Sequence, residues 1–131
     1  MRTQPQHVLV VDDEPNIADT LALILRAHGY ITRAAYDPED AILLAPTFCP
    51  DVLVSDLIMP RMSGIELANW FSASFPDCRI LLVSGNRTAI SQAVGSKRDV
   101  HAHPFLAKPA DPAAILAFVA NCAPLAGRQC A

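Results

Sequence analysis

Three short runs of this sequence are apolar at every position rather than at every second position. They cover residues 8–11, 52–54 and 80–83. A strand that is apolar on both faces must be covered on both faces, as in a parallel sheet packed between two layers of helices. Further strands are expected at 31–35 and near 105–107. The runs therefore predict an α/β fold with five strands.

Segments with the spacing of amphipathic helices separate the expected strands. Their starts are indicated by a proline in the first turn or by a polar capping residue before it. The five expected helices follow Pro15, Asp37, Ser63, Asn86 and Asp111. The predicted buried face of the first consists of Ile17, Leu21, Ile24, Leu25 and His28. We expect the second helix to end near Pro46, because proline has no backbone N–H to donate. Strands that alternate with helices predict a doubly wound sheet.

The composition predicts one globular domain. The chain has 131 residues, of which 52% are hydrophobic and 18% charged, and its net charge is −3. A chain without a basic footprint is not expected to bind nucleic acid directly. It contains no apolar stretch of membrane-spanning length, and residues 1–6 lack the apolar core of a signal peptide. We therefore expect a cytoplasmic protein with no membrane contact.

The four cysteines are expected to be free thiols. They are Cys49, Cys78, Cys122 and Cys130, and no two of them form a Cys-x-x-Cys pair. In a chain without a secretory signal, cysteines are usually small core residues rather than disulfide partners.

Polar residues follow four of the expected strands, each at the carboxyl end. Asp12 and Asp13 follow the first strand, Asp56 the third, Ser84 the fourth and Lys108 the fifth. In an open parallel sheet these ends lie along one edge, which is where ligands bind. Clustered carboxylates repel one another and are costly to bury. The pattern therefore predicts a cation site at this edge.

Four motifs in this order have a known counterpart. They are Val11-Asp12-Asp13-Glu14, the block from Asp56 to Gly64, Ser84 after a strand, and Lys108-Pro109. Over residues 8–122 the chain resembles the CheY-like receiver domain of two-component response regulators. The resemblance implies a flavodoxin-like sheet with strand order 2-1-3-4-5. In that order the fifth strand is an edge, where the missing N–H of Pro104 is tolerated.

The resemblance also implies the chemistry of the site. Asp56 would accept a phosphoryl group from a sensor histidine kinase or a histidine phosphotransfer protein. Asp12, Asp13 and Asp56 would hold Mg²⁺, or Mn²⁺ in its place, together with the backbone carbonyl of Ile58. Lys108 would pair with the carboxylate and then with the phosphoryl group.

A conformational switch is implied as well. Ser84 would donate its hydroxyl to the phosphoryl group, and Phe105 would turn inward behind it. The surface formed by the fourth helix, the fifth strand and the fifth helix would then change its binding to a downstream protein target or to a second copy of the chain. Ile58 and Asn86 flank the path of the hydrolytic water in the family. We expect the apolar Ile58 to slow loss of the phosphoryl group.

The leading functional interpretation is a single-domain receiver rather than an enzyme. Its expected limits are 1–124, followed by a short tail at 125–131 and no output domain. One alternative is a pseudo-receiver that is not phosphorylated and serves as a scaffold or dimerisation module. The other is a phosphatase with an aspartate nucleophile, but such enzymes carry a second acid two residues after the first. Ile58 occupies that position.

Overall fold

The computed structural model describes residues 5–59, 62–85, 103–108 and 110–122. Within these residues the strands form one parallel sheet in the order β2-β1-β3-β4-β5. The strands are β1 (His7–Val11), β2 (Ile31–Ala35), β3 (Val52–Asp56), β4 (Arg79–Ser84) and β5 (Phe105–Ala107). The helices are α1 (Pro15–Ala27), α2 (Pro38–Phe48), α3 (Gly64–Ser74) and α5 (Pro112–Ala120). The predicted fold class and strand order are confirmed, whereas the helix expected after Asn86 lies outside the described residues.

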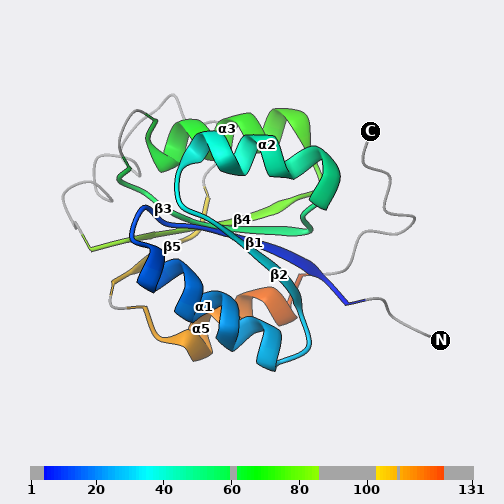
Figure 1. The fold of residues 1–131 in the computed structure, drawn as a ribbon, viewed down its shortest axis with the longest axis vertical. Coiled ribbons are helices and arrows are strands. Elements are labelled where there is room, and N and C mark those ends of the chain that lie inside the picture. Colours follow the sequence, from blue (N-terminus) through cyan, green and yellow to red (C-terminus); the bar gives the residue numbers. More distant parts are fainter. Residues whose placement is uncertain (1–4, 60–61, 86–102, 109, 123–131) are drawn as a thin grey trace.

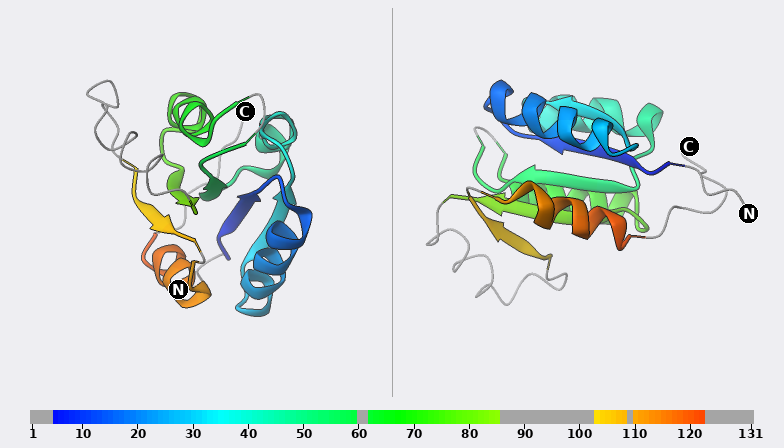
Figure 2. Two further views of the ribbon diagram at one scale, coloured as in Figure 1. Left: turned by 90° about the vertical axis from the view of Figure 1, so that its left-hand side faces the viewer. Right: turned by 90° about the horizontal axis from the view of Figure 1, so that it is seen from below.

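The sheet is covered by helices on both faces. Helices α2 and α3 lie on one face, and α1 and α5 lie on the other (Figures 1 and 2). Successive residues of β1 point to opposite faces, so Leu9 and Val11 belong to one buried cluster and Val8 and Val10 to the other. The two buried layers explain why these strands are apolar at every position. None of the helices in the described ranges is long and apolar enough to cross a bilayer.

Side-chain caps set the beginnings of three helices. Ser63 accepts the backbone N–H of Glu66 at 3.2 Å, at the start of α3. Asp37 accepts that of Asp40 at 2.8 Å before α2, and Asp111 caps α5 in the same way. Each such bond satisfies a donor that the helix cannot, and contributes about 1 kcal/mol. The helix starts read from the sequence are therefore confirmed for these elements.

The predicted end of α2 is wrong, because the helix continues past Pro46 to Phe48. Proline removes one backbone bond in the last turn, but the extra residues bring Phe48 into the core, where it is 9% exposed. Burying an aromatic side chain stabilises the fold by roughly 1.5–3 kcal/mol, which outweighs one hydrogen bond. Cys49 caps the helix after Phe48: its φ of 53° is left-handed, and its N–H donates to the carbonyl of Ala45 at 2.9 Å.

The predicted buried face of α1 is also partly wrong. The residues buried against the sheet are Ala18, Ala22 and Leu25, whereas Ile17 is 39% exposed and His28 is exposed. The two alanines face the sheet, and the larger side chains at positions 17, 21 and 24 stand beside the contact and line a cavity.

The prediction of free thiols is wrong at Cys49. Cys78 and Cys122 are free and buried, but Cys49 is disulfide-bonded. Spacing along the chain does not reveal which sulfur atoms meet in the fold, so this bond could not be predicted from the sequence. Burial, helped by the negative charge of Asp51 and by Cys122, raises the pKa of Cys78 to about 12. Its thiol is therefore neutral and unreactive at neutral pH. Cys130 lies outside the described residues.

Candidate functional site

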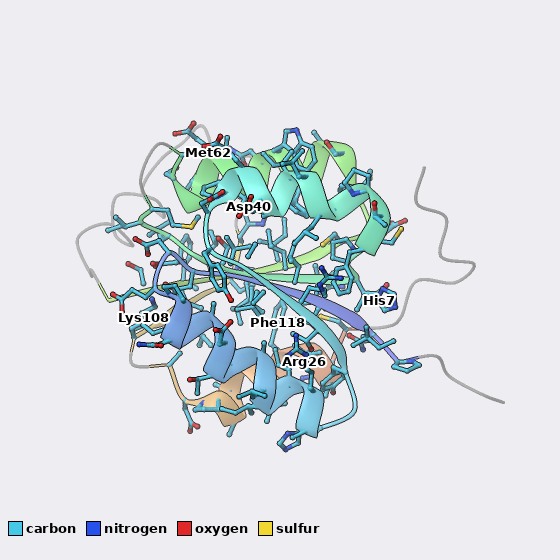
Figure 3. All side chains as sticks on the ribbon, in the orientation of Figure 1. His7, Arg26, Asp40, Met62, Lys108 and Phe118 are labelled. Atoms are coloured by element: carbon cyan, nitrogen blue, oxygen red, sulfur yellow. The ribbon has the colours of Figure 1, made fainter. Side chains whose placement is uncertain are left out.

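The strand ends named by the sequence lie side by side at one edge of the sheet. Val11 pairs with Ser55, Asp56 with Val83, and Ser84 with Ala107. The residues that follow these strands are therefore neighbours in space. Figure 3 shows Lys108 at this edge and His7, the first residue of β1, at the opposite end of the sheet.

Three aspartates form an acidic cluster at this edge. One carboxylate oxygen from each of Asp12, Asp13 and Asp56 lies within 4.8 Å of those of the other two. Asp12 is buried at 4% exposure, Asp13 is exposed, and Asp56 is intermediate. Carboxylate oxygens are hard ligands, and a cluster that keeps one member open to solvent suits a cation that retains water. The residues present therefore fit a Mg²⁺ or Mn²⁺ site.

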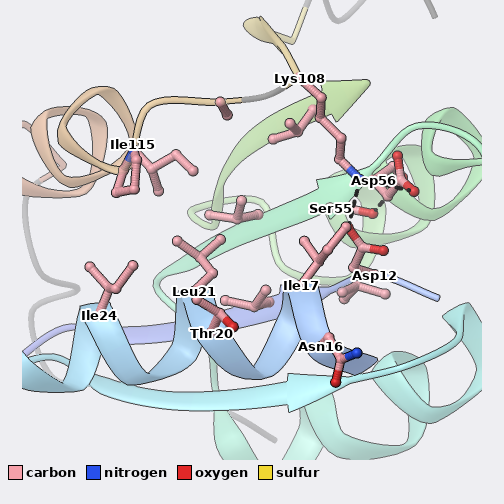
Figure 4. Close-up of a pocket in the computed structure, with 16 residues that line it drawn as sticks. Asp12, Asn16, Ile17, Thr20, Leu21, Ile24, Ser55, Asp56, Lys108 and Ile115 are labelled. Carbon is pink, nitrogen blue, oxygen red and sulfur yellow. Dashed lines mark hydrogen bonds and ion pairs between the residues drawn. The ribbon is translucent and has the colours of Figure 1, made fainter. Parts of the chain in front are cut away.

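Asp12 is held by two hydrogen bonds. Its Oδ1 accepts the backbone N–H of Glu14 at 2.9 Å, and its Oδ2 accepts Lys108 Nζ at 2.8 Å. The same ammonium group lies 3.5 Å from Asp56 Oδ2 (Figure 4). Lys108 thus contacts both acids, and Asp12, not the expected phosphoacceptor, is the nearer partner.

Charge and burial shift the pKa values of the two groups at the centre. Desolvation, helped by the charge of Asp12, raises the pKa of Asp56 above its ordinary value of 3.8. The ammonium of Lys108 and a backbone hydrogen bond from Ile58 lower this pKa, but they do not cancel the rise. For Lys108, burial lowers the pKa, but the hydrogen bond to Asp12 and the charge of Asp56 raise it above its ordinary value. The lysine therefore stays charged beside its acids.

The raised pKa of Asp56 predicts a pH-dependent cost to stability. An acid with a raised pKa binds its proton more tightly in the folded state than in the unfolded state. Its contribution to the free energy of unfolding is complete below the unfolded-state pKa, near 3.8, and is lost as the pH rises through the folded-state pKa. We therefore expect Asp56→Asn, measured without divalent cations, to have the higher free energy of unfolding at neutral pH. Urea unfolding of both proteins across this pH range tests this. The difference should shrink in acid, and a less stable variant at neutral pH would contradict it.

Gly64 is a site residue whose role the sequence did not reveal. Its N–H donates to the carbonyl of Leu57 at 2.7 Å. A Cβ atom at this position would lie 2.3 Å from the carbonyl oxygen of Asp56 and 2.7 Å from the Cα of Leu57. These are backbone atoms that cannot swing aside, so only glycine fits without moving the main chain beneath Asp56. Its place in the block after Asp56 was the available signal.

The remaining predicted residues lie at or near the same edge. Ser84 is 2% exposed and ends β4, where its carbonyl accepts the N–H of Lys108 at 2.8 Å. Phe105 pairs with Leu82 between β4 and β5 and is partly buried against the core on the α2–α3 side. Ile58 is 49% exposed. Asn86 lies outside the described residues.

Comparison with known proteins identifies relatives over most of the chain. The family model of the response regulator receiver domain matches residues 8–120. The probable transcriptional regulatory protein TcrX of Mycobacterium tuberculosis is 35% identical over 92 residues, which cover 70% of this chain and 39% of TcrX. The DNA-binding response regulator MtrA of Mycolicibacterium smegmatis is 29% identical over 119 residues, or 91% of this chain and 51% of MtrA. The chain therefore spans about half, or less, of the length of these relatives.

Solved structures show the same fold. The chemotaxis protein CheY4 of Vibrio cholerae has a TM-score of 0.79 at 26% identity. The match covers 91% of this chain and 99% of the CheY4 chain. A putative response regulator from Chloroflexus aurantiacus has a TM-score of 0.76 at 29% identity, covering 90% of this chain and 97% of its own. The family is one of signalling domains rather than classical enzymes. The chain belongs to the response regulator receiver domain family and is a CheY-like domain of two-component signalling.

Proposed function

We propose that this receiver is switched by phosphorylation of Asp56, with a sensor histidine kinase or a histidine phosphotransfer protein as donor. The observation that carries this proposal is the position of the Asp56 carboxylate. It ends a central strand, lies in a cluster with two other aspartates, and is 3.5 Å from the Lys108 ammonium. An acid between a cation site and a lysine is well placed to accept a negatively charged group.

The proposed reaction is a phosphoryl transfer in line. A carboxylate oxygen of Asp56 forms a bond to phosphorus as the bond from phosphorus to the donor nitrogen breaks. The electron pair of the broken bond stays on the donor imidazole. Mg²⁺ held by Asp12, Asp13, Asp56 and the backbone carbonyl of Ile58 would neutralise charge on the phosphoryl oxygens.

Lys108 is proposed to change partner during this reaction. Its Nζ bonds Asp12 at 2.8 Å in the structure described here and is within 3.5 Å of Asp56. A phosphoryl group on Asp56 carries about two negative charges, more than the carboxylate that it replaces. The ammonium is therefore expected to leave Asp12 for a phosphoryl oxygen, a small movement for a flexible side chain.

The signal is proposed to leave through Ser84 and Phe105. The hydroxyl of Ser84 would donate to a phosphoryl oxygen, and the ring of Phe105, now only partly buried, would turn inward. The surface of the fourth helix, β5 and α5 would then select a downstream protein or a second copy of the chain. Such a switch needs only a few kcal/mol of difference between two states.

We predict that Ile58→Asn shortens the lifetime of the phosphorylated protein by about fivefold to tenfold. The side chain is 49% exposed beside Asp56, and an amide there can orient water toward the phosphorus, which an isoleucine cannot. Decay of the adduct, followed by intact-mass spectrometry after removal of the donor, measures the effect. Ile31→Asn is the matched control, because Ile31 is 45% exposed on the edge strand β2. Equal lifetimes for wild type and Ile58→Asn would contradict the prediction.

One experiment separates this function from its alternatives. The protein is incubated with acetyl phosphate or phosphoramidate, with and without Mg²⁺, and its mass is measured. A Mg²⁺-dependent increase by one phosphoryl group supports the receiver, and no adduct favours the scaffold. Rapid turnover of a separate phosphorylated substrate favours a phosphatase.

Several predictions about the whole protein stay predictions. The words "transcriptional regulatory" and "DNA-binding" describe the two longer relatives, and this chain matches only part of each. We propose that the receiver occupies residues 1–124 with a tail at 125–131, that it does not bind nucleic acid directly and that it is cytoplasmic. Gel-shift titration with DNA tests the second of these.

A further inference from the structure

A cavity of about 430 Å³ continues from the acidic site into the interior. It lies between α1, α5 and the face of the sheet that these helices cover (Figure 4). Its inner wall is apolar and includes Leu21, Ile24 and Ile115. Asp12, Asp56 and Lys108 stand at one end.

The size of the cavity sets it apart from ordinary packing defects. Well-packed interiors hold few voids larger than a water molecule, whereas sites for small molecules begin at about 300 Å³. A small residue, Ala110, lines the cavity just before α5. A guest of the size of a substituted benzene would fill an apolar space that is otherwise costly to leave empty.

The charges at the open end decide which guest fits. The lining residues there carry two carboxylates and one ammonium, a net charge of −1. The ammonium of Lys108 is already bonded to Asp12 at 2.8 Å and is 3.5 Å from Asp56. An anionic guest would meet two carboxylates and a lysine that is already paired. A monocation would neutralise the end of the cavity.

We propose that this cavity binds a small monoamine with an apolar body, either aliphatic or aromatic. The ammonium group lies against Asp12 and Asp56, and the body lies among Leu21, Ile24 and Ile115. The amine and a divalent cation use the same carboxylates, so each weakens the binding of the other. Binding of the amine does not depend on phosphorylation of Asp56.

The test uses three probes that share one body: 4-phenylbutylamine, 4-phenylbutanol and 4-phenylbutyrate. Each is titrated into the full chain with isotope-labelled isoleucine methyl groups. The amine is expected to shift the methyl signals of Ile24 and Ile115, and to bind up to about fivefold more tightly than the alcohol, as expected for a partly exposed ion pair. The anion should bind most weakly. Tightest binding by the anion, or no shift at either methyl group, would overturn the proposal.

Two variants place the guest. Ala110→Phe fills the cavity and should abolish the methyl shifts, whereas Ala117→Phe, on the exposed side of α5, should retain them. Asp12→Asn changes the charge of the site without filling the cavity. It should remove the preference for the amine over the alcohol and leave the affinity for the alcohol unchanged. Retained binding in Ala110→Phe, or a retained preference in Asp12→Asn, would overturn the proposal.

Mg²⁺ competition separates this inference from the proposed function. If Mg²⁺ binds the protein, it should raise the apparent dissociation constant of the amine, and an unchanged constant would overturn the proposal. If Mg²⁺ does not bind, the proposed function is contradicted. The three probes and the two variants then still test the amine site by themselves.

Discussion

Replacing Asp56 by asparagine is expected to abolish the phosphorylated adduct. The amide has no anionic oxygen with which to attack phosphorus, and the buried Asp12 is not placed to replace it. Both oxygens of Asp12 already accept hydrogen bonds, from Glu14 and from Lys108. Intact-mass spectrometry after incubation with phosphoramidate and Mg²⁺ measures the result, and we expect no detectable adduct.

A matched substitution elsewhere controls for the loss of one charge. Asp77 is an exposed acid in the turn before β4, at the opposite edge of the sheet. Asp77→Asn should be phosphorylated as the wild type is. An adduct that forms on Asp56→Asn at the wild-type rate would disprove the assignment of the phosphoacceptor. Peptide mapping of that adduct would then identify the residue that reacts.

The second large effect is expected at Gly64. An added methyl group would lie 2.3 Å from the carbonyl oxygen of Asp56, well inside any permitted contact, so Gly64→Ala must displace the main chain between β3 and α3. Forcing an atom into packed structure costs roughly 1–3 kcal/mol. We expect the free energy of unfolding to fall by about that amount. Phosphorylation should also slow, because the shift moves the backbone that carries the nucleophile.

Gly85 offers the matched control at the same edge of the sheet. A methyl group there would lie 3.7 Å from the Cβ of Lys108, which is an ordinary contact. Urea unfolding and the rate of adduct formation should therefore be nearly unchanged in Gly85→Ala. Equal stability of Gly64→Ala and Gly85→Ala would show that the loop after β3 relaxes without cost.

Local chemistry explains which parts of the fold were predictable. Ser63 and Asp37 cap their helices as expected, because a cap is a contact between residues three apart in the chain. The sequence failed at the end of α2, where the burial of Phe48 outweighs the local effect of Pro46. The prediction of the buried face of α1 was also partly wrong. Which side of a helix packs against a sheet depends on the side chains of the sheet, which lie far away in the sequence.

The candidate site divides in the same way. The sequence located its acids, its lysine and its edge of the sheet, since the carboxyl ends of parallel strands converge whatever the details of packing. It paired Lys108 with the phosphoacceptor, whereas the structure places the ammonium nearer to Asp12. A difference of 2.8 Å against 3.5 Å depends on side-chain positions that no pattern encodes.

By itself, the sequence determined the class of fold, the strand order through its family resemblance, and the residues that meet at the carboxyl edge. Strand periodicity, caps and strand-end acids are short-range features, and each is readable within a few residues. Only the tertiary structure decided the partner of Lys108, the close approach of Gly64 to Asp56 and the cavity between α1 and α5. These depend on distances between segments far apart in the chain, which are set by how all of the side chains pack together.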